Sequence, residues 1–157
     1  MIYSKTIDSP IGKLGLYADK NYLLRITFCE ADEFDRSNTI LDETETQVQE
    51  YFLGKRKQFD LPLKLEGTDF QKQVWTELKK IAFGTKISYQ ELASRVGSIK
   101  KARAVGTANH YNPIPIIIPC HRVVRKNGEL GGFAGGLDVK RFLLDLESSN
   151  VLKSDQA

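Results

Sequence analysis

Cysteine and histidine are scarce in this chain, with two of each among 157 residues. Two cysteines are too few for a disulfide framework, so a reducing, intracellular setting is expected. A closed zinc site needs four Cys or His ligands at short spacings. His110, Cys120 and His121 cluster without a fourth such partner, and Cys29 stands alone. We therefore predict no structural zinc site and no cofactor, although counting leaves open a metal site built with carboxylates.

Long hydrophobic runs are also missing. No apolar stretch approaches the ~20 residues that a membrane helix needs, and the start of the chain lacks the apolar region of a signal peptide. The content of 41% hydrophobic and 27% charged residues is typical of a soluble globular protein. We expect one ordinary domain or two small ones, a monomer without an obligate protein partner, and a cytoplasmic location, or a nuclear one in a eukaryote.

Acidic residues are absent from positions 92–128, although the whole chain carries a net charge of only +3. The simplest interpretation of such a run is a solvated face. A block of one sign inside an otherwise acidic chain favours a polyanionic partner such as nucleic acid. The block contains seven positive residues: Arg95, Lys100, Lys101, Arg103, Arg122, Arg125 and Lys126.

The first third of the chain is rich in β-forming residues interrupted by turn residues. Positions 2–7, 14–18 and 22–28 predict three short strands in an antiparallel meander. Apolar residues at helical spacing predict a helix over 41–53, which Gly54 ends. Positions 55–68 show no usable period and are interpreted as the connection between two small domains.

The second half begins with two sequences typical of helix N-termini. Thr68 to Gln71 forms a capping box, and the apolar stripe behind it predicts a helix that ends near Gly84, with Trp75 in the core. Ser88 to Glu91 forms a second capping box before a short helix that Gly97 ends. Ser98 then caps a third helix.

Small residues and cations dominate this third helix, which resembles the second member of a helix-turn-helix. Small side chains allow a helix to approach a partner closely, and cations neutralise phosphates. Close packing against another helix is the alternative. The residues concerned are Lys100, Lys101, Ala102, Arg103, Ala104, Gly106 and Thr107.

The remaining segments predict a wing and a final helix. Prolines at 113, 115 and 119 argue against a central strand over 114–118. Asn127-Gly128 predicts a β-hairpin, a glycine-rich stretch covers 131–136, and an amphipathic helix is expected over 137–147. Helices followed by a hairpin resemble a winged helix-turn-helix.

Cys120 is the candidate nucleophile. A lone cysteine is usually a small buried hydrophobe, which is what we expect of Cys29. Cys120, however, is followed by His121 and Arg122, and cationic neighbours lower the pKa of a thiol. His121 could act as a base that a carboxylate such as Glu147 orients. In an extended strand adjacent side chains point to opposite faces, so the pair would need a turn or a bridging water.

The run from Asn112 to Val124, NPIPIIIPCHRVV, resembles the active-site signature of the O6-alkylguanine-DNA alkyltransferases. The likeness extends from about Phe70 to Glu147 and includes ISYQ at 87–90, ARAVG at 102–106 and GGL at 135–137. The first half of the chain matches this family in length and strand order.

This resemblance implies an α+β fold with two domains. A small antiparallel-sheet domain, ribonuclease H-like, would cover residues 1–66, and a winged helix-turn-helix alkyltransferase domain would cover residues 67–157. The implied activity is repair of double-stranded DNA containing alkylated bases. After nucleotide flipping, the alkyl group of O6-methylguanine, or of O4-methylthymine, would move irreversibly to Cys120, once per molecule.

The resemblance also implies a role for each matching residue. Cys120 would be the alkyl acceptor, His121 its base through a water, and Glu147 the carboxylate that holds His121. Tyr89 would assist protonation of the departing guanine, because guanine is a poor anionic leaving group. Asn112 would order the turn before the active-site segment, and Arg103 would fill the space in the base stack. Further DNA contacts are expected from Lys100, Lys101, Ala102, Ala104, Gly106, Thr107 and Arg122.

The chain departs from some relatives in the substrate loop, which contains Gly132, Phe133 and Ala134. Some relatives have Tyr-Ser in place of Phe133-Ala134, so two hydroxyls that could contact the lesion oxygen are missing and backbone N–H groups would replace them. Lys101 stands where some relatives keep a small residue. The zinc ligands of some relatives have no counterpart.

Two other classes of function remain open. One is a non-enzymatic, lesion-binding or regulatory winged-helix protein, although lesion-binding relatives replace the acceptor cysteine. The other is a thiol hydrolase that uses Cys120, His121 and Glu147, a reading that leaves the basic segment unexplained.

Overall fold

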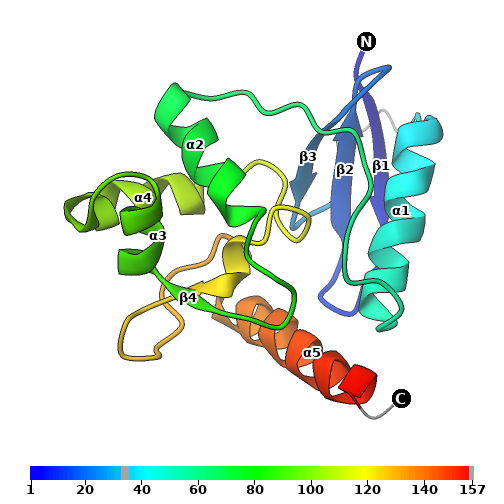
Figure 1. Ribbon diagram of the computed structural model, residues 1–157. Coiled ribbons are helices and arrows are strands. Elements are labelled where there is room, and N and C mark those ends of the chain that lie inside the picture. Colours follow the sequence, from blue (N-terminus) through cyan, green and yellow to red (C-terminus); the bar gives the residue numbers. More distant parts are fainter. Residues whose placement is uncertain (33–35, 156–157) are drawn as a thin grey trace. The chain divides into compact units, whose positions relative to one another are not determined.

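A computed structural model describes the backbone of residues 1–32 and 36–155 and the side chains of residues 1–32 and 36–151. The chain forms two compact units, Met1–Leu65 and Glu66–Ala157 (Figure 1). Among the described residues, no helix combines the length and the apolar character needed to cross a membrane.

The N-terminal unit contains a three-stranded antiparallel sheet, as predicted. Strands β1 (Tyr3–Ile7), β2 (Leu14–Ala18) and β3 (Leu23–Thr27) lie in the order β1-β2-β3. The first pair runs in register from Tyr3 opposite Ala18 to Ile7 opposite Leu14. The second pair shifts register between Tyr17 and Ala18. Apolar residues of all three strands are buried and form the core of this unit.

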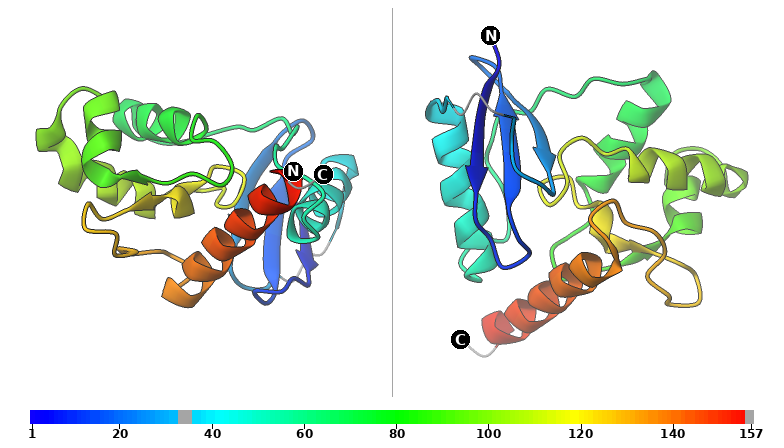
Figure 2. Two further views of the ribbon diagram at one scale, coloured as in Figure 1. Left: turned by 60° about the horizontal axis from the view of Figure 1, so that its bottom comes forward. Right: turned by 180° about the vertical axis from the view of Figure 1, so that it is seen from behind.

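Helix α1 (Thr39–Phe52) covers the sheet and contacts all three strands (Figure 2). The side chain of Asn38 accepts a hydrogen bond from the Leu41 backbone N–H at 3.0 Å, which satisfies one free donor of the first turn. Gly54 follows the helix with φ +76°, a conformation that a side chain would strain. The predicted helix is confirmed and begins two residues earlier than expected, at Thr39 rather than Leu41.

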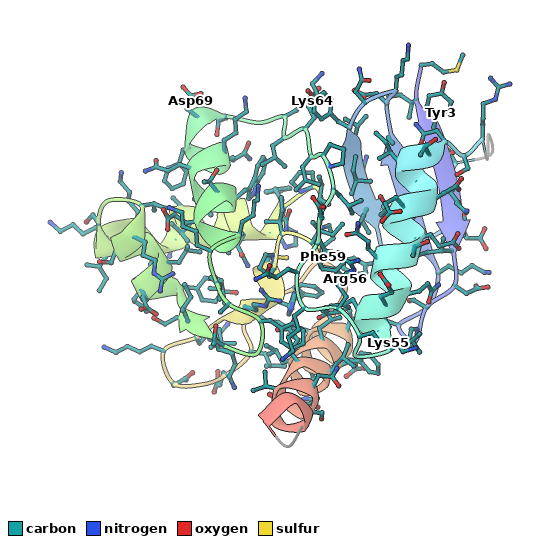
Figure 3. All side chains as sticks on the ribbon, turned by 45° about the vertical axis from the view of Figure 1, so that its right-hand side comes forward. Tyr3, Lys55, Arg56, Phe59, Lys64 and Asp69 are labelled. Carbon is teal, nitrogen blue, oxygen red and sulfur yellow. The ribbon has the colours of Figure 1, made fainter. Side chains whose placement is uncertain are left out.

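The segment after α1, in which the sequence analysis found no period, returns along the helix and then extends the sheet. Figure 3 shows Arg56 and Phe59 near α1, where Arg56 Nε donates to Glu50 at 2.9 Å. Farther along, Leu63 forms a parallel bridge with Leu23. Backbone hydrogen bonds make this bridge. Leucines at 61, 63 and 65 alternate with Asp60, Pro62 and Lys64, and the leucines are half-buried while the residues between them are exposed. This short strand-like period, interrupted by a proline, is a signal that the sequence analysis missed.

Three helices open the C-terminal unit: α2 (Asp69–Leu78), α3 (Tyr89–Arg95) and α4 (Ala102–His110). They pack against one another (Figure 1). The predicted capping box of α2 is complete, because Thr68 Oγ1 accepts from the Gln71 N–H and Gln71 Oε1 accepts from the Thr68 N–H. Trp75 is 2% exposed and donates its indole N–H to the Ala108 carbonyl at 2.9 Å, which confirms its place in the core.

The helix-turn-helix is formed by α3 and α4, with two differences from the prediction. Ser88 caps α3 through the Glu91 N–H, but the Glu91 carboxylate pairs with Arg95 at 3.4 Å rather than completing a capping box. Ser98 caps a 3₁₀ turn (Ile99–Lys101), and the α-helix proper begins only at Ala102.

The predicted hairpin forms only at its turn, where the Arg125 N–H donates to the Glu129 carbonyl at 2.8 Å, and no second strand follows among the described residues. Gly128 has φ +89° and its N–H donates to the Arg125 carbonyl at 2.9 Å. The strand before this turn, β5 (Val123–Val124), pairs in parallel with β4 (Ile87–Ser88). Beyond the turn the carbonyls of Leu130 and Gly132 accept from the Lys140 side chain, so this stretch is a loop held to the last helix. That helix, α5 (Leu137–Asp155), continues beyond the predicted end at 147.

Replacing Thr68 with Ala removes the side-chain acceptor at the start of α2. We expect the free energy of unfolding of the C-terminal unit to fall by about 1 kcal/mol, measured by urea unfolding followed through Trp75 fluorescence. Thr76→Ala, at an exposed position inside the same helix, is the control and should leave the unfolding midpoint unchanged or raise it slightly. Equal destabilisation by both substitutions would contradict the capping role.

Candidate active site

Cys120 and His121 lie in a 3₁₀ turn (Cys120–Arg122) rather than in the extended strand that separates adjacent side chains. Cys120 is 4% exposed and His121 is fully buried. The Arg122 N–H donates to the Pro119 carbonyl at 3.0 Å and closes the turn. The turn therefore presents a thiol and an imidazole inside the protein, on consecutive residues.

Asn112 holds the segment that leads into this turn. Its side-chain N–H donates to the Ile118 carbonyl at 2.7 Å, and its side-chain oxygen accepts from the Ile114 N–H at 3.0 Å. Between these two points Ile116 adopts φ +75°, which is unfavourable for a β-branched residue. The buried isoleucines and the two Asn112 bonds together impose this conformation.

Glu147 from α5 is the centre of a buried polar network. Its carboxylate accepts from His121 Nε2 at 2.6 Å and from Arg122 Nε and Nη2 at 2.8 and 3.1 Å. The backbone N–H of Gly84 adds a fourth donor at 3.2 Å. Arg122 also donates through Nη1 to the Ile81 carbonyl at 2.7 Å. A buried carboxylate is stable here because its hydrogen-bonding capacity is filled.

The network sets the charge states of its members. Burial disfavours the charge of Glu147, but the hydrogen bonds from His121 and Arg122 and the positive charge of Arg122 outweigh burial and lower the pKa of Glu147 to about 2. Burial lowers the pKa of His121, so this ring is neutral near pH 7. An ionised Glu147 requires the proton of the neutral ring on Nε2. Nδ1 is then left as an acceptor, and it is buried without a hydrogen-bond partner among the described residues.

Two expectations about this turn are corrected by the network. Arg122 was expected to bind DNA, but it is 6% exposed and its guanidinium is bonded to Glu147 and Ile81. The positive charge of Arg122 therefore stabilises the Glu147 carboxylate and does not lower the pKa of the Cys120 thiol. Burial raises the pKa of Cys120 to about 11, although Asn112 and Lys140 act in the opposite direction, so the resting thiol is protonated.

Lys140 on α5 is a functional candidate that the sequence analysis missed. It is fully buried and donates to the carbonyls of Leu130 and Gly132 and, at 3.5 Å, to the hydroxyl of Tyr89. Burial lowers the pKa of Lys140 to about 8. The signal available in the sequence was its spacing, because Lys140 precedes the buried Leu143 and Leu144 by three and four residues and so shares their face of the helix.

A pocket of about 250 Å³ lies between α4 and the glycine-rich loop. Tyr89 is one of its walls, and burial raises the pKa of Tyr89 so that the phenol stays protonated. Gly131 has φ +73°, and a Cβ there would lie 2.9 Å from the Tyr89 hydroxyl, so the close approach requires glycine. The lining residues are Tyr89, Ala102, Gly106, Asn109, His110, Arg125, Gly131 and Gly132.

The residues expected to bind DNA divide between the outer face of the helix-turn-helix and the pocket. Lys100, Lys101, Arg103, Ala104 and Thr107 are exposed. Ala102 and Gly106, which are half-buried, line the pocket. In the substrate loop Ala134 is exposed and Phe133 is half-buried, with its carbonyl accepting from the Gly136 N–H at 3.0 Å.

Cys29 is exposed, so the expectation that it packs in a core is wrong. Within residues 1–32 and 36–151, no group of three or more His, Cys, Asp or Glu side chains could hold a metal ion.

A helix-turn-helix next to a buried thiol and a His–Glu pair is typical of a DNA-binding protein with a candidate nucleophilic cysteine. Comparison with protein families gives the same class. Residues 69–149 match the DNA-binding domain of 6-O-methylguanine DNA methyltransferase, and residues 2–65 match the ribonuclease-like domain of the same family. The chain belongs to the 6-O-methylguanine DNA methyltransferase family, and the expected ribonuclease-like fold of its first half is confirmed.

Individual relatives agree with this assignment. The chain is 43% identical over 155 residues to a methylated-DNA–protein-cysteine methyltransferase of Methanosarcina acetivorans, covering 94% of this chain and 99% of the relative. It is 41% identical to the constitutive enzyme of Bacillus subtilis, covering 94% and 96%. The crystal structure of the Mycobacterium tuberculosis O6-methylguanine methyltransferase matches with a TM-score of 0.88 at 42% identity, covering 96% and 94%. A structure of the M. tuberculosis protein in complex with DNA matches with a TM-score of 0.89, covering 94% of each chain.

Replacing Glu147 with Gln leaves the buried Arg122 without its counter-charge, so we expect the free energy of unfolding at pH 7 to fall by about 3 kcal/mol. The pKa of Glu147 is about 2 in the folded protein against an ordinary 4.5. Its ionised form therefore stabilises the fold above pH 4.5, and this contribution is lost as the pH falls towards 2. The difference between wild type and Glu147→Gln in urea unfolding should shrink across that range.

The exposed Asp145 on the same helix provides a matched control. Asp145→Asn should change stability little at any pH in this range. A Glu147→Gln penalty that stays constant between pH 5 and pH 2 would show that the carboxylate charge is not what stabilises the network.

Proposed function

We propose that this chain repairs O6-methylguanine in double-stranded DNA by moving the methyl group to its own Cys120. The observation that carries the proposal is the buried Cys120–His121–Glu147 arrangement, placed beside a pocket that α4 of the helix-turn-helix helps to form. Family membership supports the reaction class, because the relatives are methylated-DNA–protein-cysteine methyltransferases.

The first step activates the thiol. Nδ1 of His121 is a buried acceptor that the Glu147 bond leaves unprotonated, so it takes the proton of Cys120 through one water. The imidazolium that forms is stabilised by the adjacent Glu147 carboxylate. A base is required because burial raises the pKa of Cys120 to about 11, so the resting thiol is protonated near pH 7 and must lose its proton as the methyl group is transferred.

The second step transfers the methyl group. The Cys120 sulfur forms a bond to the methyl carbon while the bond from that carbon to guanine O6 breaks, and the electron pair stays on the base. Tyr89 donates its proton to the departing guanine, which leaves as a neutral base. The nearby ammonium of Lys140, 3.5 Å from the Tyr89 hydroxyl, stabilises the phenolate until it regains a proton. The product is a thioether with no easy leaving group, so each molecule reacts once.

The alkylated base must leave the duplex to reach a buried sulfur. Extruding a nucleotide from the duplex costs a few kcal/mol. A side chain inserted into the space that the nucleotide leaves in the base stack offsets part of this cost. Arg103 is exposed on α4 and fills this role. Lys100 and Lys101 precede the helix and contact phosphates, and the small side chain of Ala104 permits a close approach to the groove. Arg125, exposed at the rim of the pocket, replaces the buried Arg122 as the cation that faces the DNA.

The remaining properties follow from this reaction. Repair needs no metal or cofactor, because the methyl acceptor belongs to the chain itself. A DNA substrate and two free thiols suit an intracellular protein, in the cytoplasm or in a eukaryotic nucleus. We place the boundary between the two domains after residue 66, so that the catalytic domain covers residues 67–157. We also propose that the protein acts as a monomer. The same transfer chemistry would also accept O4-methylthymine, whose methyl group is likewise bonded to a base oxygen.

Cys120→Ser tests the proposal directly. The hydroxyl keeps the size of the side chain but is a far weaker nucleophile, so methyl transfer from an O6-methylguanine duplex should fall below detection. DNA affinity, measured by fluorescence anisotropy with the same duplex, should stay within a factor of about two. Methyl transfer by this variant at the wild-type rate would overturn the assignment.

Arg103→Ala should lower the rate of methyl transfer by roughly tenfold to a hundredfold, because the flipped state loses the side chain that holds it. The control is Arg141→Ala, which removes an exposed arginine of α5 and should leave the rate within twofold. With O6-methylguanine in single-stranded DNA, where no partner base must be replaced, the effect of Arg103→Ala should be much smaller. An equal loss on both substrates would contradict a role in flipping.

A further inference from the structure

Asn109 on α4 is buried, carries an unused acceptor and lies next to the residue that bears the thiol. It is 4% exposed, and its side-chain N–H donates to the Cys120 carbonyl at 3.4 Å. Its Oδ1 is buried with no hydrogen-bond partner among the described residues. Asn109 is also part of the pocket wall, together with Tyr89 and Gly131.

The free atom of Asn109 is an oxygen. Rotating the amide by half a turn would bring Oδ1 against the Cys120 carbonyl, and two acceptors facing each other repel. The contact with Cys120 therefore assigns the nitrogen to the carbonyl and leaves the oxygen without a donor. A buried acceptor without a donor is costly. Because Asn109 is also a lining residue of the pocket, a ligand that enters the pocket and displaces the Asn109 side chain slightly is the candidate donor for this oxygen. The Oε1 atom of Gln90 is also unpartnered, but Gln90 does not line this pocket.

We infer that Asn109 is a specificity-determining residue whose Oδ1 accepts a hydrogen bond from the exocyclic amino group of O6-alkylguanine. This inference rests on the proposed function. Alkylation at O6 removes the hydrogen from guanine N1, so the 2-amino group is the remaining N–H donor of the flipped base. O4-alkylthymine has no hydrogen on N3 and no amino group, and it offers no donor to Asn109.

Asn109 thereby discriminates between the two lesions that the transfer chemistry alone would accept. A guanine lesion satisfies the buried oxygen, whereas a thymine lesion leaves it unpaired. Sites built to hydrogen-bond a substrate group reject analogues that lack the group, because the buried polar atom is left without a partner. The protein is consequently a guanine-selective repair protein, with O4-methylthymine as a poor substrate.

The test compares lesions that differ in one amino group. Single-turnover rates are measured with duplexes containing O6-methylguanine or O6-methylhypoxanthine, which lacks the 2-amino group, with wild type and with Asn109→Leu. We expect wild type to react about tenfold faster with O6-methylguanine. Asn109→Leu, of similar size but without the acceptor, should bring the ratio of the two rates close to one. The same substitution should narrow the preference for O6-methylguanine over O4-methylthymine.

A second variant separates the acceptor from the bond to Cys120. Asn109→Asp keeps an oxygen acceptor but loses the donor to the Cys120 carbonyl, so both rates should fall while the preference for the amino-bearing base is retained. The rate ratio is the readout in every case, and a substitution that only damages folding lowers both rates together.

Two results would overturn the inference: equal rates of wild type on the two purines, or a preference that survives in Asn109→Leu. Loss of the preference in Asn109→Asp would show that the bond to Cys120, and not the acceptor, carries selectivity. Failure of wild type to remove the methyl group from O6-methylguanine would instead overturn the proposed function.

Discussion

The buried carboxylate of Glu147 holds the reactive turn in place. It receives donors from three directions: the imidazole of His121, the guanidinium of Arg122 and the backbone of Gly84. Removing the carboxylate from water is costly, and only a full set of donors compensates for that cost. The same bonds fix the proton of His121 on Nε2 and leave Nδ1 as a base. Structural stability and the chemistry of the site therefore depend on one interaction.

Helix α4 links this buried network to the DNA-binding face. Its outer side carries the exposed Arg103, and its inner side carries Asn109, which donates to the Cys120 carbonyl. Trp75 holds α4 in place through the hydrogen bond from its indole N–H to the Ala108 carbonyl. A single short helix thus connects the surface expected to meet DNA with the residue expected to accept the methyl group.

The sequence predicted those features that depend on neighbouring residues. The antiparallel meander, the capping box at Thr68, the core position of Trp75 and the helix-turn-helix were recognisable because turns, caps and periodicity are local. The DNA role expected of Arg122 was wrong, because a cation in a basic segment gives no sign that a carboxylate 25 positions away neutralises it. The role of Lys140 was missed because its partners are the backbone carbonyls of the loop after the turn, and the sequence gives no sign of such bonds. The same bonds hold that loop to α5, where the sequence predicted the second strand of a hairpin. The roles that the family resemblance implies for the site residues remain predictions.

Mapping of the transferred methyl group shows whether the thiol held by this network is the acceptor. The protein would be incubated with excess duplex carrying isotopically labelled O6-methylguanine, digested, and analysed by peptide mass spectrometry. We expect one labelled methyl group per molecule, on the peptide containing Cys120, with the exposed Cys29 unmodified. A label on Cys29, a label on no cysteine, or more than one methyl group removed per molecule would contradict this expectation.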